Sequence, residues 1–382
     1  MHKSSIRVAV VGLGFGAEFV PIYLHHPDVD GVAICDSDPR RLEYVGEKFG
    51  VADRYLDFQE ALASDDWDAV HLVTPIPVHV EQQIAVLESG RHCACTVPMA
   101  TSIDDLNAVI AARRRSGKNY MMMETAVYCR EFLYAQELAE RGVLGSIQFL
   151  RGAHYQDMEG WPWYWRGLPP LWYGTHAISP LLRLAGTRAT KVHCFGTGRM
   201  RQELIDQYGN PFPMETGIFR LEGTDVAAEA ARSLFHVGRE YQESFNVYGE
   251  NAVFEWGQTG ADAPVLFTIE PMEALKSNRG RSTKAERAEV PDYAHRLPPG
   301  IGRFTTKGVY DESNPHMSFL QGGGHGGSHP HLVHEFVRSI VEGRRPSIDD
   351  VTAANWCAAG ICAHKSALRD GEGVIVPSFN GA

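Results

Sequence analysis

The sequence predicts two domains: an N-terminal α/β domain with a doubly wound parallel sheet, and a C-terminal α+β domain with a large antiparallel sheet. At 382 residues the chain is long enough for both. Strand and helix patterns alternate from residue 6 to about residue 124, which is typical of a parallel sheet with helices on both faces. Several strands joined only by turns follow, which indicates antiparallel pairing. We therefore expect domains over residues 1–126 and 127–382, and the C-terminal helices could pack back on the first domain.

The first strand, turn and helix carry the pattern of a dinucleotide-binding site. Val8 to Val11 form a short apolar run, and Gly12-x-Gly14-x-x-Ala17 follows at once, before a helix that should run to about Leu24. The first glycine allows the tight turn, the second lets a pyrophosphate approach the backbone, and the alanine lets the helix pack closely on the strand. The helix start presents free N–H groups to the phosphates. The pattern predicts a Rossmann domain in which Gly12, Gly14, Phe15 and Gly16 contact the cofactor.

The second strand indicates which dinucleotide binds. The apolar run from Gly31 to Cys35 ends in Asp36. An acid at this position accepts hydrogen bonds from the ribose hydroxyls of NAD and repels the 2′-phosphate of NADP. Asp38 adds to that repulsion, whereas Arg40 and Arg41 could soften it. We therefore expect NAD as the cofactor, with Asp36, Ser37 and Arg40 at the ribose.

The alternation continues through the rest of the first domain. The strand over residues 69–73 ends in Thr74-Pro75, a stiff turn at the carboxyl end of a central strand, where open α/β sheets bind ligands. His79 starts the next helix. We expect further strands near 54–55 and over 92–96 and 120–124, and helices over 39–49, 58–64, 81–90 and 103–116.

The second domain is expected to contain strands over 147–155, 192–198, 216–221, 227–235, 240–248 and 251–256. Its expected helices cover residues 131–141, 176–184 and 332–342, and a last helix opens at residues 347–351 and ends at Leu368. The aromatic stretch 155–173 could form either core or a platform for a sugar, because Trp faces stack on apolar surfaces. The basic stretch 276–287 is expected to be an exposed loop.

Composition excludes several kinds of partner. The net charge of −11 argues against nucleic acid and anionic membranes. We find no basic, apolar leader and no 18-residue apolar run. Seven cysteines without framework spacing argue against disulfides. We therefore expect a soluble cytoplasmic protein with a small-molecule substrate and no metal.

These motifs together resemble the Gfo/Idh/MocA oxidoreductase family over nearly the whole chain. The resemblance implies that Thr74, Pro75 and His79 lie along the cofactor, as do Thr96, Val97 and Pro98 after the fifth strand. It also implies that Trp165-Arg166 corresponds to a Trp-Arg pair that touches the dinucleotide.

The departures from the family pattern concern catalysis. Dehydrogenases of the family carry Glu-Lys-Pro where this chain has Thr96-Val97-Pro98, and valine cannot move a proton. Their Asp-x-Gly-x-His-x-x-Asp frame reads Trp172-x-Gly174-x-His176-x-x-Ser179 here, so only the glycine and the histidine remain. The site is therefore either a binding module or a site for different chemistry.

The glycine-rich segment Gly322-Gly-Gly-His325-Gly-Gly favours different chemistry. It resembles a loop of the NAD-dependent glycosidases of the superfamily, such as the bacterial α-N-acetylgalactosaminidases. Glycines permit close backbone approach to a sugar and let one histidine project from the loop. One alternative is a flexible glycine linker whose histidine has no functional role. A metal site formed with His329, His331 and His334 is another, which the glycines and Pro330 disfavour.

The predicted reaction is redox-neutral cleavage of a glycoside: transient oxidation of the C3 hydroxyl, elimination, addition of water and re-reduction, with NAD as a catalytic electron sink. The alternatives to this reaction are an NAD-dependent sugar or polyol dehydrogenase that uses His176 alone, and a non-catalytic NAD or sugar binder.

The expected catalytic residues are His176, His325 and Tyr128, with Glu124 and Asp157 behind them. Glu124 could equally be a structural acid.

Two further expectations concern substrate and assembly. Residues 120–126 and 157–162 resemble the branch that includes NAD-dependent sulfoquinovosidases, which cleave a sulfonated glucoside. Arginine suits a sulfonate because its planar fork presents several donors. The open face of the antiparallel sheet predicts a homodimer or homotetramer. The expected substrate-binding residues are Tyr155, Trp172, Arg199 and Arg201.

Overall fold

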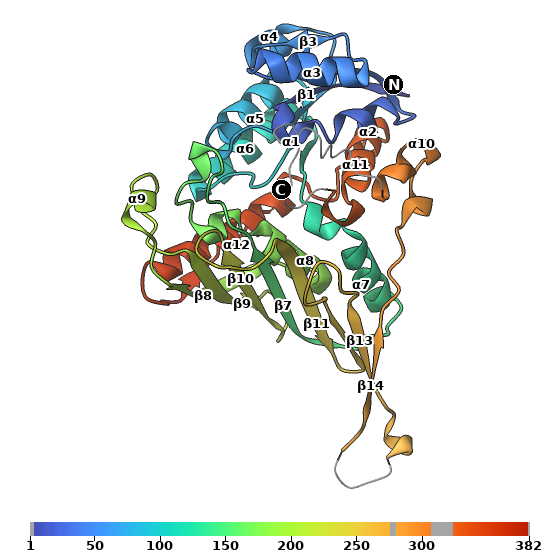
Figure 1. Ribbon diagram of the computed structural model, residues 1–382, viewed down its shortest axis with the longest axis vertical. Helices are drawn as coiled ribbons and strands as arrows, with labels where there is room; N and C mark the ends of the chain where they lie inside the picture. The colour runs from blue at the N-terminus through green and yellow to red at the C-terminus, as the bar shows by residue number, and fades with distance from the viewer. Residues whose placement is uncertain (1–3, 276–279, 307–323, 381–382) are drawn as a thin grey trace. The chain divides into compact units, whose positions relative to one another are not determined.

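The computed structural model describes residues 4–275, 280–306 and 324–380 (Figure 1). No helix in these ranges is long and apolar enough to cross a membrane. All seven cysteines are buried, and none of them forms a disulfide within the described part of the chain. The chain divides into two compact units, each built from separate stretches of sequence. Unit 1 comprises residues 1–128, 292–358 and 379–382, and unit 2 comprises residues 129–291 and 359–378.

Unit 1 is built on a six-stranded parallel sheet with the order β3-β2-β1-β4-β5-β6. This is the order of a doubly wound dinucleotide-binding sheet, whose direction of winding reverses between β1 and β4. The predicted Rossmann sheet is thus confirmed. Its strands are β1 (Ile6–Val11), β2 (Val29–Cys35), β3 (Arg54–Tyr55), β4 (Ala69–Leu72), β5 (His92–Cys95) and β6 (Tyr120–Met122).

One helix of unit 1 differs from the prediction. The expected first helix is two short helices, because Pro21 has no N–H to donate to the carbonyl of Ala17 and the helix restarts around it. The side chain of Asp38 caps α3 as predicted, by accepting a hydrogen bond from the Arg40 N–H. The helices of unit 1 are α1 (Leu13–Gly16), α2 (Val20–Leu24), α3 (Pro39–Phe49), α4 (Phe58–Ala63), α5 (His79–Glu88), α6 (Ile103–Ser116), α10 (Pro299–Gly302) and α11 (His329–Val341).

Unit 2 is built on a nine-stranded sheet with the order β14-β13-β12-β11-β7-β10-β9-β8-β15. The predicted antiparallel sheet is confirmed with one exception, since β7 and β10 pair in parallel and make the sheet mixed. Its strands are β7 (Ile147–Tyr155), β8 (Ala189–Thr197), β9 (Met214–Leu221), β10 (Ala227–Ser233), β11 (Gln242–Gly249), β12 (Ala252–Glu255), β13 (Val265–Ile269), β14 (Thr283–Arg287) and β15 (Val374–Ile375).

The basic stretch 276–287 was predicted as a loop, and this is wrong for its second half. Residues 283–287 form β14, which pairs with β13. Every residue of β14 is exposed, so the strand lacks the alternation of apolar and polar residues from which a strand is predicted. Residues 276–279 lie outside the described part of the chain.

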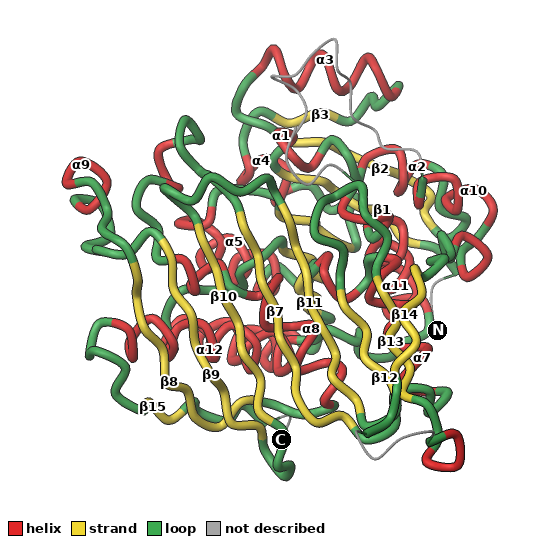
Figure 2. Tube along the Cα trace, turned by 60° about the horizontal axis from the view of Figure 1, so that its bottom comes forward, coloured by secondary structure: helices red, strands yellow, loops and turns green. Residues whose placement is uncertain are grey.

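Helix α8 lies across one face of the sheet, against β7, β10 and β11. A Cβ added to Gly152 on β7 would lie 2.0 Å from the carbonyl oxygen of Ala177 on α8, so the helix packs directly on the strand backbone. Figure 2 views the other face of the strands, with α8 behind them. The helices of unit 2 are α7 (Arg130–Glu140), α8 (Thr175–Ala185) and α9 (Gln202–Ile205), while α12 (Asp350–Ala367) contributes residues to both units.

Candidate functional site

The glycine turn of unit 1 lies tightly on the ends of its central strands. Gly12 has a φ of +89°, and a Cβ at this position would lie 2.4 Å from the carbonyl oxygen of Val73. Its N–H donates to the carbonyl of Cys35 at 2.8 Å, which ties the turn to β2. A Cβ on Gly16 would meet the side chains of Val73 and Val10 at 3.2 and 3.3 Å. Only glycine fits the turn at Gly12, as the dinucleotide fingerprint requires.

Asp36 braces this turn from the end of β2. It is buried, and its Oδ2 accepts a hydrogen bond of 2.7 Å from the N–H of Leu13, while its Oδ1 accepts one of 2.8 Å from Asp38 N–H. Arg41, rather than the predicted Arg40, lies 3.3 Å from this carboxylate, and Arg40 extends toward Asp38 instead. A carboxylate beside a glycine turn can accept hydrogen bonds from the free ribose hydroxyls of a dinucleotide.

His79 connects the two turns that follow β4 and β5. Its Nε2 lies 2.8 Å from the carbonyl oxygen of Thr74, and its Nδ1 lies 2.9 Å from that of Pro98. Burial lowers the pKa of His79. Val97 is buried, and the hydroxyl of Thr74 donates to Gln82 at 2.6 Å. With both ring nitrogens facing backbone, His79 positions these turns.

The predicted catalytic residues Glu124 and Tyr128 lie at the end of the first stretch of the same unit. Glu124 is buried and caps a short 3₁₀ helix (Thr125–Val127) by accepting from the N–H of Ala126 at 2.9 Å. The hydroxyl of Tyr128 lies 2.6 Å from that of Ser347. The contact of Glu124 is the one expected of a structural acid, which was the alternative for this residue.

His325 lies against the dinucleotide turn. It belongs to a 3₁₀ turn (His325–Gly327), and its ring centroid is 5.4 Å from that of Phe15. Its Nδ1 lies 3.1 Å from Nε2 of His329. The four histidines of the metal alternative do not converge, because His331 stacks on Tyr128 and His334 lies 2.9 Å from His26.

The centre of unit 2 carries a row of polar residues that crosses four strands. Glu215, Arg232, His154 and Glu243 are register partners on β9, β10, β7 and β11 in turn. Register partners share a face of a sheet, so all four belong to the face on which α8 packs. The first three are fully buried, and the side chain of Glu243 is 10% exposed.

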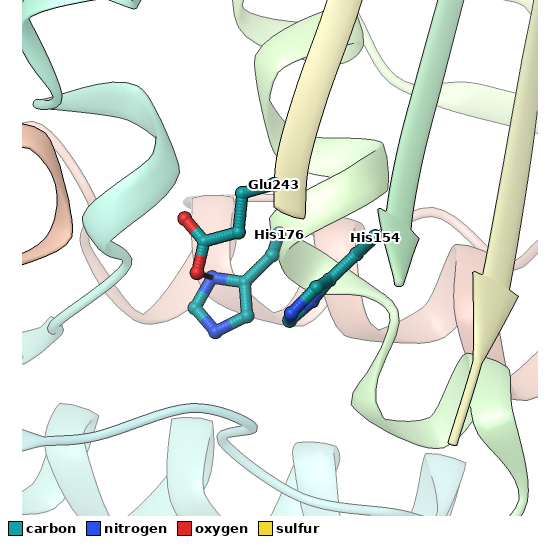
Figure 3. A group of neighbouring side chains, drawn as sticks. All are labelled: His154, His176 and Glu243. Atoms are coloured by element: carbon teal, nitrogen blue, oxygen red, sulfur yellow. Dashed lines mark ion pairs between the residues drawn. The ribbon is translucent and has the colours of Figure 1, made fainter. Parts of the chain in front are cut away.

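His176 on α8 faces the β11 end of this row (Figure 3). Its Nδ1 lies 3.8 Å from Oε1 of Glu243, and its Nε2 lies 3.3 Å from the hydroxyl of Tyr173. The rings of His176 and His154 are 5.0 Å apart. The hydroxyl of Tyr241 donates to Glu243. His176 therefore has a carboxylate at one nitrogen and a phenol at the other, the surroundings of a histidine that exchanges protons.

Arg232 adds a fixed positive charge. Its guanidinium donates to the carbonyls of Tyr173, His154 and Ser233 at 3.1, 3.2 and 2.6 Å and to Oε1 of Gln156 at 2.9 Å. Burial lowers its pKa to about 10, so it remains charged at neutral pH. Burial and the neighbouring Glu243 raise the pKa of Tyr241 well above its usual value.

His154, His176 and Glu243 could also be considered as metal ligands, because their ligand atoms lie within 4.8 Å of one another. Tetrahedral zinc places its ligand atoms about 3.4 Å apart, whereas Nδ1 of His176 and Oε1 of Glu243 lie 3.8 Å apart. Arg232 and the hydrogen bond from Tyr241 compete with a cation for Glu243. The arrangement suits acid–base chemistry better than metal binding.

The other predicted residues of unit 2 lie at different distances from His176. Trp165 is buried, and its ring packs edge-on against Tyr173 at 4.8 Å, so it backs this cluster. Tyr155 follows His154 on β7 and therefore points to the opposite face of the sheet. Trp172 packs on His364 at 5.5 Å. Of these three residues, the structure brings only Trp165 to the cluster.

The predicted charged residues of unit 2 have other partners. Arg166 is exposed and donates to the carbonyl of Glu203 at 3.4 Å. Asp157 accepts from the N–H of Glu159 at 3.0 Å. Arg201 forms ion pairs with Glu159 and Glu203, and Arg199 is exposed.

Sequence reasoning missed His154, Tyr173, Tyr241 and Glu243. One signal was available for His154, which follows Leu150 and Gly152 at the inward positions of β7 and is a polar residue in a buried frame. Glu243 gave no such signal, because only the pairing of β11 with β7 brings it beside His154.

The sheet order, the glycine turn and the acid after β2 define unit 1 as an NAD-binding Rossmann domain. Residues 6–124 match the family model described as "Oxidoreductase family, NAD-binding Rossmann fold". This domain thus belongs to the Gfo/Idh/MocA family, and its cofactor is NAD.

Two of the relatives are named as members of a glycosidase family. The chain is 24% identical to a glycosyl hydrolase family 109 protein of Streptomyces niveus over 99% of its own length and 78% of that protein. It is 30% identical to glycosyl hydrolase family 109 protein 1 of Bacteroides thetaiotaomicron over 46% of its length, and spans 42% of that protein. Levoglucosan dehydrogenase in complex with NADH shares the fold, with a TM-score of 0.76 at 19% identity over 98% of this chain and all of that chain.

Proposed function

We propose that the protein is an NAD-dependent glycoside hydrolase that cleaves its substrate without net oxidation. The observation that carries this proposal is the setting of His176. The catalytic frame of the family keeps this histidine here and loses its lysine and aspartate partners. Glu243 supplies a carboxylate 3.8 Å from its Nδ1, from a strand that is distant in the sequence. A binding module would have no need for a buried carboxylate, histidine and phenol in line.

Similarity to glycosyl hydrolase family 109 proteins supports the glycosidase rather than the dehydrogenase. Bound NAD supplies reversible oxidation of the sugar C3 hydroxyl to a ketone. Oxidation at C3 makes the C2 proton acidic, so a base can remove it and the C1 substituent can leave; water then adds at C1, and reduction of C3 restores the sugar.

The residues have separate roles in this proposal. The turn at Gly12, Gly14 and Gly16 holds the pyrophosphate, and Asp36 binds the ribose. His176 exchanges a proton with the sugar, while Glu243 offsets the charge of the imidazolium that forms. His325 and Tyr128 are the further acid–base candidates, with Asp157 behind them, and Glu124 behind them only if it is more than the structural acid that its capping contact indicates.

An NAD-dependent sugar or polyol dehydrogenase is the second candidate, favoured by the likeness in fold to levoglucosan dehydrogenase. For the substrate, a sulfonated glucoside requires a fixed cation. Arg201 is already paired with Glu159 and Glu203, which leaves exposed Arg199 as the arginine for that role and favours a neutral glycoside.

The test uses the purified protein with NAD⁺ and a panel of nitrophenyl glycosides that includes the N-acetylgalactosaminide, the glucoside and the sulfoquinovoside. We expect release of nitrophenol without accumulation of NADH. Stoichiometric NADH from free sugars would instead support the dehydrogenase, and neither signal with NAD⁺ bound would support the binder. His176→Ala should abolish the release, and His193→Ala, which alters an exposed histidine of β8, should not.

A further inference from the structure

Unit 1 contains a chain of three titratable side chains that the binding of a dinucleotide does not explain. Nδ1 of His329 lies 3.0 Å from Oε2 of Glu18, and Nε2 of the same ring lies 3.1 Å from Nδ1 of His325. Glu18 and His329 are 4% and 3% exposed, whereas His325 is half-buried. The chain thus leads from the interior to the histidine of the glycine-rich loop.

The direction of the hydrogen bonds follows from the carboxylate. An ionised Glu18 can only accept, so Nδ1 of His329 carries the hydrogen. Nε2 of a neutral His329 is then an acceptor, and Nδ1 of His325 must donate to it. In this tautomer, Nε2 of His325 carries no hydrogen and can therefore accept a proton.

We propose that Glu18 and His329 are positioning residues that hold His325 with Nε2 as a proton acceptor and share the proton that it takes up. This inference rests on the proposed function, in which His325 exchanges a proton with the sugar. It assigns a positioning role to two further residues: His329 at the start of α11, and Glu18 between α1 and α2.

The proton balance of the chain is simple. A proton from a sugar O–H or from the acidified C2–H bonds to Nε2 of His325, and its electron pair stays on the sugar. The proton on Nδ1 of His325 passes to Nε2 of His329, which becomes an imidazolium beside the Glu18 carboxylate. The reverse shift returns the proton to the substrate, so the chain serves as base and acid in turn.

The surroundings suit this transfer. The ring of Phe19 lies 4.7 Å from that of His329, and the ring of Phe15 lies 5.3 Å from it, so the chain is flanked by apolar groups in which the attraction of an ion pair is strong. Oε1 of Glu18 is buried and has no hydrogen-bond partner among the described residues, so the charge of the carboxylate is directed at His329.

Among the described residues, two other titratable groups that pack here, His71 and Tyr23, are uncharged at neutral pH. His71 on β4 faces the same cluster, and burial lowers its pKa to about 3. Tyr23 on α2, whose hydroxyl lies 3.2 Å from Nδ1 of His71, has its pKa raised by burial. The backbone N–H of Gly324 donates weakly to Glu18 at 3.4 Å.

The first test needs no substrate. Ring-nitrogen NMR on the full-length protein with labelled histidines and bound NAD⁺ reports which nitrogen of each neutral histidine ring carries hydrogen. The His325→Gln and His329→Gln variants assign the signals. We expect hydrogen on Nδ1 of both His325 and His329. Hydrogen on Nε2 of neutral His325 would overturn the proposal while leaving the proposed function untouched.

The second test is kinetic. Glu18→Gln should lower nitrophenol release on the order of tenfold and move the acidic limb of the pH–rate profile to lower pH, because the lost negative charge no longer favours the protonated chain. Glu43→Gln, at an exposed site on α3, should change neither. An unchanged rate and pH profile in a Glu18→Gln variant that still binds NAD⁺ would contradict the proposal. If the wild-type protein releases no nitrophenol, the proposed function fails. The NMR result alone then decides whether Glu18 and His329 hold His325 with Nε2 as the acceptor.

Discussion

Glu243 on β11 is the direct cross-strand partner of His154 on β7. Their shared row faces α8, so the carboxylate comes within 3.8 Å of His176 although 67 positions (243 minus 176) separate the two residues in the sequence. The row gives His176 an acid that does not come from its own helix, where Ser179 occupies the place of the family's aspartate.

Glu243→Gln should therefore lower kcat on the order of 100-fold, because the amide cannot offset the charge of the His176 imidazolium. NAD⁺ affinity should be unchanged, since Glu243 belongs to unit 2. The measurement is steady-state turnover together with calorimetry of NAD⁺ binding. Glu229→Gln on β10, where Glu229 pairs with Arg151 on the other face of the sheet, is the matched control. Equal loss in both variants would show a general effect on the sheet.

Asp36→Ala should weaken NAD⁺ binding by about 1.5–3 kcal/mol, the value of a charge-assisted hydrogen bond to a ribose hydroxyl. It should also release Arg41, now 3.3 Å from the carboxylate, and so improve NADP⁺ binding. Calorimetry with both dinucleotides measures these changes, with exposed Asp53→Ala as the control. Equal or tighter binding of NADP⁺ by the wild-type protein would refute the role given to Asp36.

Acid should destabilise unit 1 through its buried histidines. Burial lowers the pKa of His71 to about 3, whereas a histidine in the unfolded chain titrates near 6.5. Below about pH 6.5 the unfolded chain therefore binds a proton that the folded unit does not, and stability falls as the pH decreases toward 3. The contribution of His71 approaches about 1.4 kcal/mol per pH unit.

His71→Leu should remove that slope. Urea unfolding followed at pH 7.5, 6 and 5 compares this variant with the wild type and with His193→Ala at an exposed site of unit 2. The prediction does not hold if the free energy of unfolding of His71→Leu depends on pH as steeply as that of the wild type.

The face of the nine-stranded sheet opposite α8 should form the contact of a homodimer or homotetramer. Phe195 on β8 and Ile218 on β9 are 54% and 56% exposed there. Exposed apolar residues on one sheet face are typical of an interface. Light scattering at micromolar concentration should give a homo-oligomer, which Ile218→Glu shifts toward monomer. Leu56→Glu, at an exposed apolar site of unit 1, should leave it unchanged. A monomeric wild-type protein would rule out this assembly.

The parallel sheet of unit 1 was predictable because its signals are local. Buried parallel strands are continuous apolar runs, and the turn at Gly12 needs glycine for steric reasons that act within a few residues. Pro21 also indicated a break in the first helix, although the expected helix ran through it to about Leu24. Strand β14 had no local signal, since water contacts both of its faces.

By itself, the sequence determined the Rossmann domain and NAD as its cofactor, and it singled out His176 and His325 as candidates, because each follows from residue types at fixed spacing. The partners of both histidines were decided only by the tertiary structure. Glu243 reaches His176 through the pairing of β11 with β7, and Glu18 reaches His325 through His329, which begins a helix 311 positions (329 minus 18) further along the chain. Hydrogen bonds act over about 3 Å, so such partners are set by strand register and helix packing, which spacing along the chain does not record.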